Sequence, residues 1–250
     1  MLITSKENET VKEIKKMKDK KFRKDKFLIE GIKMLREAIN ENANIELIII
    51  RENTKIDFDI SSYKIMEVNE AVFNSLTDVV SPQGVIAIIR KKNNIEVDKN
   101  AEYILALDGV QDPGNLGTII RTADSANLNQ IIVSKDTVDA FSPKVVRSTM
   151  GAIYRVNIIE VESLVETLKN LKDSGFKTVT TSLDTSKSIY DLKYNKKVVI
   201  IGNEANGVSK EVQKISDYKV KIPMLGKTES LNASVATGIM IYEYVRQKLE

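Results

Sequence analysis

The chain has 250 residues, of which 42% are hydrophobic and 29% charged, which predicts one large or two modest domains with a true core. It contains no cysteine and no histidine, so disulfides, thiolate metal ligands and histidine-based catalysis are excluded. A charged start and the lack of any apolar run of about 18 residues argue against a secretory signal or a membrane span and fit a cytoplasmic protein.

The net charge of +3 is small, but basic residues cluster near the start of the chain. Residues 11–26 (VKEIKKMKDKKFRKDK) hold nine basic side chains and three acidic ones. Such a patch suits a polyanion such as RNA, because binding releases counterions. A solvated helix face is the simpler explanation on charge alone.

The first part of the chain alternates helical and strand patterns. Residues 6–24 predict a Lys-rich helix with a thin apolar stripe, residues 27–29 form a short apolar run, and residues 31–40 have helical spacing. Further on, the sequence predicts strands at 45–50, 64–68 and 85–89 and a helix at 70–76. We therefore expect a small α/β domain over residues 1–91, followed by a polar linker at 92–101.

The remainder, residues 102–250, again alternates strands and helices, which predicts a parallel sheet. Strands are expected at 103–107, 131–133, 177–181, 198–201 and 219–222. Helices are expected at 116–126, 143–150, 161–171, 208–215 and from 231 to the end. Ligands of such sheets collect beyond the carboxyl ends of the strands, so the candidate loops are 108–117, 202–207 and 223–230.

Each of these loops is only a moderate signal when taken alone. In the first, Asn115 and Gly117 precede Arg121, whose planar guanidinium suits a phosphate; a tight turn with a surface arginine is the plainer interpretation. In the second, Glu204 lies between Gly202 and Gly207, where it could hold a donor group or simply cap a helix. This loop lacks the Lys-Ser/Thr pair of a phosphate-binding loop, which excludes a nucleoside triphosphatase.

The third loop begins at Ile222 and leads through Ser230 and Asn232 into the last helix. A serine in that position is more often a helix cap than a catalytic group. No two glycines of the chain are two residues apart, so the G-x-G fingerprint of dinucleotide-binding proteins is absent.

Together and in this order, the loops resemble the three motifs of the SpoU (TrmH) family within the SPOUT superfamily. The motifs are N-x-G-x-x-x-R from Asn115 to Arg121, G-x-E-x-x-G from Gly202 to Gly207, and I-P-M-x-G…S-L-N from Ile222 to Asn232. The resemblance covers about 103–247, and FLIEGIKMLREAI and SPQGVIAI match weaker markers of the family's N-terminal domain.

The resemblance implies a fold, a cofactor and an activity. It implies an α/β SPOUT-type parallel sheet whose C-terminal segment forms a trefoil knot, preceded by a small α/β substrate-binding domain like ribosomal protein L30e. It also implies a homodimer with sites across its interface that uses S-adenosylmethionine to methylate the 2′-oxygen of an RNA ribose. No metal is expected.

The resemblance also assigns roles to residues of this chain. The catalytic group it implies is Asn115, Arg121, Glu204, Ser230 and Asn232. The cofactor-binding residues it implies are Gly202, Asn203, Gly207, Ile222, Met224 and Leu231. Together with this resemblance, the basic stretch is interpreted as a surface that binds RNA. The residues expected to contact RNA are Lys15, Lys16, Lys20, Lys21, Arg23, Lys24 and Arg147.

Family mechanism gives the proton-accepting role to Arg121, assisted by an RNA phosphate. Because the pKa of an arginine lies above about 12, we expect Arg121 to clamp the phosphate and lower the pKa of the hydroxyl, with proton acceptance secondary. Asn115 and Asn232 would orient the ribose, and Glu204 would hold the site together.

The two-domain layout favours ribosomal (23S) RNA as the substrate. Three alternatives stay open: a transfer-RNA methyltransferase of the same family, a non-catalytic RNA-binding or ribosome assembly factor, and a general α/β nucleotide-binding protein. The last leaves the triple motif unexplained.

Overall fold

The computed structural model describes residues 2–92 and 95–250, which form two compact units. One unit consists of Met1–Asn94 together with Asp139–Tyr154, and the other of Ile95–Val138 together with Arg155–Glu250. The linker predicted at 92–101 includes residues 93–94, which lie outside the described residues. The sequence prediction put all of 102–250 in one domain, whereas the contacts of Asp139–Tyr154 group this segment with the first unit.

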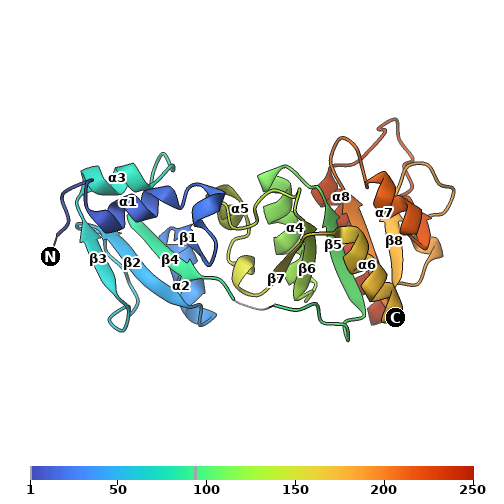
Figure 1. The fold of residues 1–250 in the computed structure, drawn as a ribbon, viewed down its shortest axis with the longest axis horizontal. Helices are drawn as coiled ribbons and strands as arrows, with labels where there is room; N and C mark the ends of the chain where they lie inside the picture. Colours follow the sequence, from blue (N-terminus) through green and yellow to red (C-terminus); the bar gives the residue numbers. More distant parts are fainter. Residues whose placement is uncertain (1, 93–94) are drawn as a thin grey trace. The chain divides into compact units, whose positions relative to one another are not determined.

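The N-terminal unit is built on a four-stranded sheet in the order β1-β4-β2-β3. The strands are β1 (Lys26–Glu30), β2 (Ile45–Arg51), β3 (Ile65–Val68) and β4 (Val85–Arg90), and the helices of the leading segment are α1 (Glu9–Lys16), α2 (Ile32–Asn40) and α3 (Glu70–Leu76). Only the β2–β3 pair is parallel. Helices α1 and α3 lie together on one side of this sheet and α2 on the other (Figure 1). Val11 and Ile14 of α1 and Phe73 of α3 pack in one apolar cluster with the sheet.

One expectation for this unit is wrong in detail, and one apolar run had no element assigned to it. The helix predicted over 6–24 ends at Lys16, and the chain then forms a short 3₁₀ turn, η1 (Lys20–Phe22), capped by the Asp19 side chain. The apolar run at 27–29 is the centre of strand β1. Its three residues are all buried, so it lacks the alternation that marks a half-exposed strand.

The segment Asp139–Tyr154 joins this unit through side chains far away in sequence. It carries α5 (Pro143–Ser148) and the 3₁₀ turn η2 (Ala152–Tyr154). The ring of Phe141 lies 5.0 Å from that of Phe27 between centroids, and the Tyr154 hydroxyl donates to the Met34 carbonyl at 3.1 Å. Arg23 completes the attachment with an ion pair to Asp139 at 2.6 Å.

The C-terminal unit contains a six-stranded sheet in the order β10-β8-β9-β5-β6-β7. Its strands are β5 (Tyr103–Asp108), β6 (Gln130–Ser134), β7 (Asn157–Val161), β8 (Lys177–Thr181), β9 (Lys197–Gly202) and β10 (Tyr218–Val220). Every neighbouring pair is parallel, which confirms the predicted α/β class. Strand β7 was not predicted, and Val161 ends this strand rather than starting a helix.

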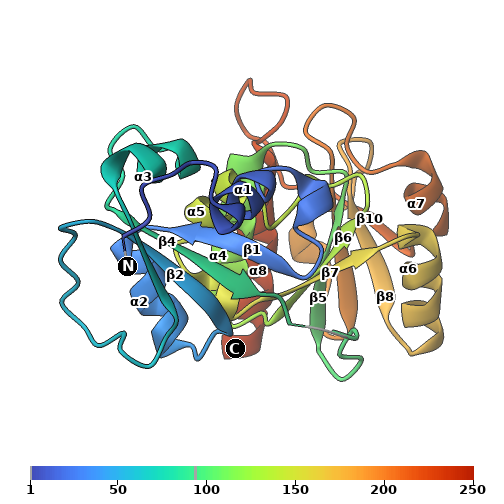
Figure 2. The same ribbon diagram turned by 60° about the vertical axis from the view of Figure 1, so that its left-hand side comes forward.

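Helices cover both faces of this sheet (Figures 1 and 2). They are α4 (Pro113–Ser125), α6 (Leu164–Asp173), α7 (Lys210–Ile215) and α8 (Ala233–Leu249), with the 3₁₀ turn η3 (Ile189–Asp191) before β9. Ile104 and Ala106 of β5 face the cluster formed with α6 and α7, while Tyr103 stacks on Tyr244 of α8 with centroids 4.7 Å apart. This alternation explains why the strand is apolar throughout.

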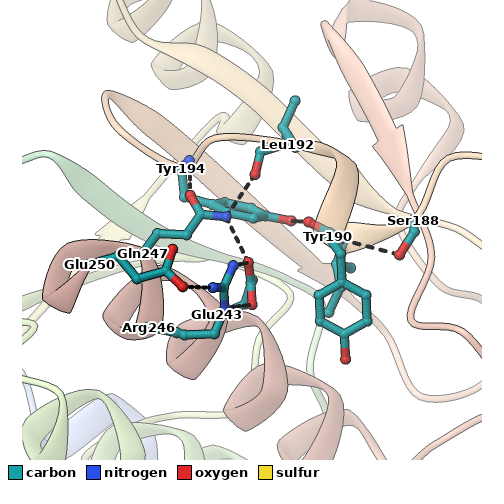
Figure 3. A network of polar contacts seen from close by, with 9 residues as sticks. Ser188, Tyr190, Leu192, Tyr194, Glu243, Arg246, Gln247 and Glu250 are labelled. Atoms are coloured by element: carbon teal, nitrogen blue, oxygen red, sulfur yellow. Dashed lines mark hydrogen bonds and ion pairs between the residues drawn. The ribbon is translucent and has the colours of Figure 1, made fainter.

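The second half of α8 is fixed by a polar network, drawn in Figure 3. Gln247 donates to the Leu192 carbonyl at 2.8 Å and accepts from the Tyr194 N–H at 3.0 Å. Glu243, which is 4% exposed, accepts from Gln247 at 2.7 Å and from Arg246 at 2.9 Å. The helix that begins at Asn232 is therefore anchored at its far end. Among the described residues, no helix combines the length and apolar character needed to cross a membrane.

Candidate active site

The candidate site lies where two neighbouring strands of the C-terminal sheet end. Strands β5 and β9 pair in parallel, so that Asp108 stands beside Gly202. The loops that follow them therefore leave the same edge of the sheet. The Asp108 carboxylate accepts the Ser209 N–H at 2.7 Å and ties the second loop to the first strand.

Glu204 collects three donors from the first loop. Its carboxylate accepts the N–H groups of Gln111 at 3.0 Å and Asp112 at 3.1 Å. The Asn115 side-chain amide donates to it as well, at 3.0 Å. The backbone donors of Gln111 and Asp112 were not predicted; the signal for them is their position before the first turn of α4, where N–H groups lack helical partners.

Asn115 connects this carboxylate to the last helix. It is 8% exposed, and its amide oxygen accepts from the side chain of Asn232 at 2.9 Å. Asn232 caps α8, because its own oxygen accepts the N–H groups of Ser234 at 2.8 Å and Val235 at 3.3 Å. Three of the five predicted catalytic residues thus meet, although they come from three separate loops.

The direction of these hydrogen bonds is fixed by the chemistry of Glu204. An ionised carboxylate only accepts, so the NH₂ group of Asn115 must face it, and the amide oxygen of Asn115 must face Asn232. Asn232 then has to donate from its NH₂ group, which leaves its oxygen for the helix cap. The network accordingly has one arrangement as long as Glu204 carries its charge.

The same contacts set the ionisation of Glu204. Partial burial by itself would raise the pKa of this carboxyl. The hydrogen bonds from Asn115 and from the backbone of Gln111 and Asp112 outweigh that effect and lower the pKa below its ordinary value. Glu204 is therefore a fixed negative charge at neutral pH and an acceptor, not a proton donor.

The second loop is closed so tightly that Gly202 has no room for a side chain. A Cβ at this position would lie 2.0 Å from the carbonyl carbon of Gly207. Asn203 and Gly207 exchange two backbone hydrogen bonds, at 3.0 and 2.9 Å. The Asn203 side chain also donates to the Gly109 carbonyl at 2.8 Å, so this predicted cofactor residue holds the two loops together.

The third loop presents apolar groups at the same edge of the sheet. Ile222, Met224 and Leu231 are half-buried, and Leu225 is 100% exposed. Ser230 is exposed as well. Half-buried apolar side chains at this edge of the sheet suit a partly apolar ligand. No cluster suited to binding a metal ion occurs among the described residues.

Arg121 and Ser230 are not brought into this hydrogen-bonded group. Arg121 lies on the exposed side of α4, and the side chains of Arg121 and Ser230 have no hydrogen bond or ion pair to any residue of 2–92 and 95–250. Thr122, next to Arg121, lies 3.8 Å from the position of a Cβ on Gly238. The arginine itself lies at the surface of the C-terminal unit.

The predicted RNA-contacting residues all lie in the N-terminal unit. Lys16, Lys20, Lys21 and Lys24 are exposed, and Lys15 and Arg147 are half-buried. Arg23 differs from the rest, because it is 4% exposed. Its guanidinium donates to the Asp139 carboxylate and to the Met17 carbonyl, the latter at 2.6 Å, so it supports the fold rather than offering its charge to a ligand.

A hydrogen-bonded polar group at the carboxyl edge of a parallel α/β sheet lies where proteins of this fold class bind their ligands. Comparison with known proteins gives the family. Residues 102–242 match the SpoU rRNA Methylase family, and residues 8–87 match the MRM3-like substrate binding domain. The chain belongs to the SpoU rRNA Methylase family, as its three motifs predicted, and is an RNA methyltransferase.

Individual relatives resemble the chain over its whole length. The 23S rRNA (guanosine(2553)-2′-O)-methyltransferase RlmP of Bacillus subtilis is 32% identical over 244 residues, which cover 96% of this chain and 97% of RlmP. The crystal structure of an AdoMet-bound rRNA methyltransferase from Sinorhizobium meliloti has a TM-score of 0.86 at 32% identity, covering 100% of this chain and 99% of that one.

A tRNA-modifying TrmH/SpoU enzyme from A. aeolicus is similar over a smaller part. It has a TM-score of 0.55 at 34% identity and covers 59% of this chain and 76% of its own. The rRNA methyltransferase from Sinorhizobium meliloti therefore matches both units in length, whereas this tRNA enzyme does not.

Proposed function

We propose that the protein transfers the methyl group of S-adenosylmethionine to the 2′-oxygen of a ribose in ribosomal RNA. The observation that carries the proposal is the hydrogen-bonded group of Asn115, Glu204 and Asn232 at the carboxyl edge of a parallel sheet. Full-length similarity to a 23S rRNA 2′-O-methyltransferase supports ribosomal RNA as the substrate.

S-adenosylmethionine supplies an electrophilic methyl group when bound. Gly202, Asn203, Gly207, Ile222, Met224 and Leu231 would hold it, because they form the tight turn and the apolar loop beside the network. Asn115 and Asn232 orient the ribose, and Ser230 contributes a hydroxyl at the start of the last helix. Their task is mainly positioning, since a methyl transfer needs the attacking oxygen in line with the bond that breaks.

We propose further that Arg121 acts in the site of a second copy of the chain. Val235 and Tyr242 are each 49% exposed on α8, and they lie seven residues apart, on one face of the helix. The Tyr242 hydroxyl lies 3.2 Å from the Ser125 hydroxyl of α4, the helix that carries Arg121. A homodimer built on this face would cover these apolar groups and carry Arg121 to the partner, where it would clamp an RNA phosphate.

The reaction is tested with radiolabelled S-adenosylmethionine and purified ribosomal and transfer RNA. We expect label in ribosomal RNA and a gap in its alkaline hydrolysis ladder, because 2′-O-methylation removes the hydroxyl that attacks the phosphate. Label without a gap would contradict ribose methylation, and label confined to transfer RNA would favour the tRNA alternative. Binding of RNA and cofactor without transfer would favour an RNA-binding or assembly factor.

Two finer expectations accompany this function. A ribosomal RNA substrate supports a cytoplasmic location, which we include in the proposal. The trefoil knot expected for the C-terminal segment is part of the same proposal, and it is compatible with the return of the segment after β10 to Asn115 of α4.

A further inference from the structure

Phe22 is an exposed aromatic side chain in the basic part of the N-terminal unit. Its exposed fraction is 42%, against 3% for Phe27 and 0% for Phe73 in the same unit. A single exposed apolar side chain is common on protein surfaces and needs no explanation by itself. The surroundings of Phe22 are what set it apart.

Three exposed lysines surround this ring in sequence: Lys20, Lys21 and Lys24. The Lys21 ammonium lies 4.9 Å from the ring centroid. Of the two acidic residues within 19–25, Asp19 pairs with Lys21 itself at 3.4 Å, whereas Asp25 pairs with Arg90 at 3.3 Å and leaves Lys20 and Lys24 as further positive charges. The surface around Phe22 therefore combines one aromatic face with an excess of positive charge.

The turn that presents Phe22 is held in shape from inside. The Asp19 carboxylate accepts the Lys21 N–H at 3.2 Å, and the backbone N–H of Phe22 donates to the Asp19 carbonyl at 3.1 Å. Arg23, the next residue, points inward to the Asp139 carboxylate and the Met17 carbonyl. Because Arg23 is fixed, Phe22 is displayed on a preorganised turn, which lowers the entropy lost on binding.

We propose that Phe22 is a stacking platform for an unpaired base of the RNA substrate, with Lys20, Lys21 and Lys24 holding the adjoining phosphates. An aromatic face within a cationic surface is the usual chemistry of single-stranded RNA binding, since every base has a π-face and every linkage a charge. A protein partner fits less well, because lysine is depleted in protein interfaces. The inference rests on the proposed RNA substrate and adds a recognition residue outside the motifs.

The sequence offers a direct test, because it contains no tryptophan. Phe22→Trp gives the full-length protein a single indole, whose fluorescence is quenched when a base stacks on it. The probes are a 12-nucleotide single-stranded RNA and a duplex of the same length, titrated at one salt concentration because phosphate contacts weaken with salt. Ile65→Trp is the matched control, since Ile65 is 43% exposed on β3 of the same unit.

We expect saturable quenching of the Phe22→Trp protein by the single strand, weaker quenching by the duplex, and none for Ile65→Trp. Phe22→Ala should raise the Kd for the single strand at least about fivefold, while Ile65→Ala leaves it within about twofold. Equal quenching of both tryptophan proteins, a preference for the duplex, or an unchanged Kd in Phe22→Ala would each overturn the proposal.

These outcomes are separable from the fate of the proposed function. Quenching and Kd are measured without S-adenosylmethionine, whereas methyl transfer is measured on the wild-type protein. If the wild-type protein fails to methylate RNA while the Phe22→Trp protein shows the quenching, the proposed reaction is refuted and the stacking residue stays in place. Normal methyl transfer by the wild-type protein without quenching of the Phe22→Trp protein would refute the stacking residue and leave the proposed reaction in place.

Discussion

The two units of the molecule use their polar side chains in opposite ways, and two arginines show the contrast. Arg23 of the N-terminal unit is 4% exposed, and its guanidinium is engaged by Asp139 and Met17. Arg121 of the C-terminal unit is exposed, and its guanidinium has no hydrogen bond or ion pair within the described part of the chain. A saturated arginine stabilises a fold, whereas an unsaturated one is available to a ligand or a second copy.

The same contrast applies to the carboxylates. Asp139 is 10% exposed and fixes a segment of the chain. Glu204 lies at the open edge of the sheet, where three donors hold it and two amides extend from it toward the third loop. We therefore expect changes in the N-terminal unit to act on folding and RNA affinity, and changes around Glu204 to act on turnover.

The largest stability effect is expected from Arg23→Met. The substitution leaves the Asp139 carboxylate without its cation in a nearly buried place, which costs about 3–5 kcal/mol. The free energy of unfolding in urea measures it. Arg36→Met is the matched control, because the pair of Arg36 with Asp57 is 46% and 75% exposed and such a pair contributes little to stability in water. Equal losses in both variants would contradict the assignment of Arg23 to the fold.

Glu204→Gln is expected to reduce kcat about tenfold to a hundredfold. A glutamine presents an NH₂ group to donors that need an acceptor, so one of them loses its partner, and the Asn115–Asn232 arrangement loses its direction. The measurement is methyl transfer to RNA at saturating substrate. Glu166→Gln on the exposed surface of α6 is the control. An unchanged kcat in the Glu204→Gln variant would contradict the assignment of Glu204 to the active site.

Gly202→Ala tests the tight turn. Its new Cβ would lie 2.0 Å from the Gly207 backbone, and forced overpacking costs about 1–3 kcal/mol. We expect a lower unfolding temperature together with weaker S-adenosylmethionine binding, measured by calorimetry. Gly226→Ala should leave the unfolding temperature unchanged, because no heavy atom lies within 4 Å of its Cβ position. Equal unfolding temperatures of the Gly202→Ala and Gly226→Ala variants would contradict a closed turn at Gly202.

The smallest effect is the contribution of Glu204 to acid stability. Its pKa is lowered in the folded protein, so its stabilising contribution is present above the pKa of the unfolded state and is lost as the pH falls through the lowered folded pKa. Unfolding free energies measured between pH 7 and pH 3 should fall less steeply for Glu204→Gln than for the wild type. A parallel pH dependence in the two proteins would contradict this sign.

The sequence predicted the C-terminal unit well, because its strands are apolar runs and its site residues lie in motifs at strand ends. It did not predict β7, whose residues NIIEV form an outer strand of the sheet with only one buried side chain. It also missed the interruption after α1, where Asp19 starts a new turn. Both features depend on local burial and capping that compete with the overall periodicity.

The attachment of Asp139–Tyr154 to the N-terminal unit lay beyond sequence reasoning for another reason. Arg23 and Asp139 are 116 positions apart, and no pattern in either segment shows that they pair. Arg23 accordingly looked like one more RNA-binding residue in a basic stretch. The meeting of Asn115, Glu204 and Asn232 was predictable only because the three motifs occur together.

The most direct test of the proposed two-copy site mixes two inactive variants. Arg121→Ala and Asn115→Ala are each expected to lose most methyl transfer as homodimers. In a mixed dimer, the chain with intact Asn115 and Glu204 would receive Arg121 from its partner, so one complete site forms in each mixed dimer. The account predicts that transfer to ribosomal RNA reappears when the two proteins are unfolded and refolded together. Mass measurement would show whether mixed dimers form. Mixed dimers that form and remain inactive would contradict the account.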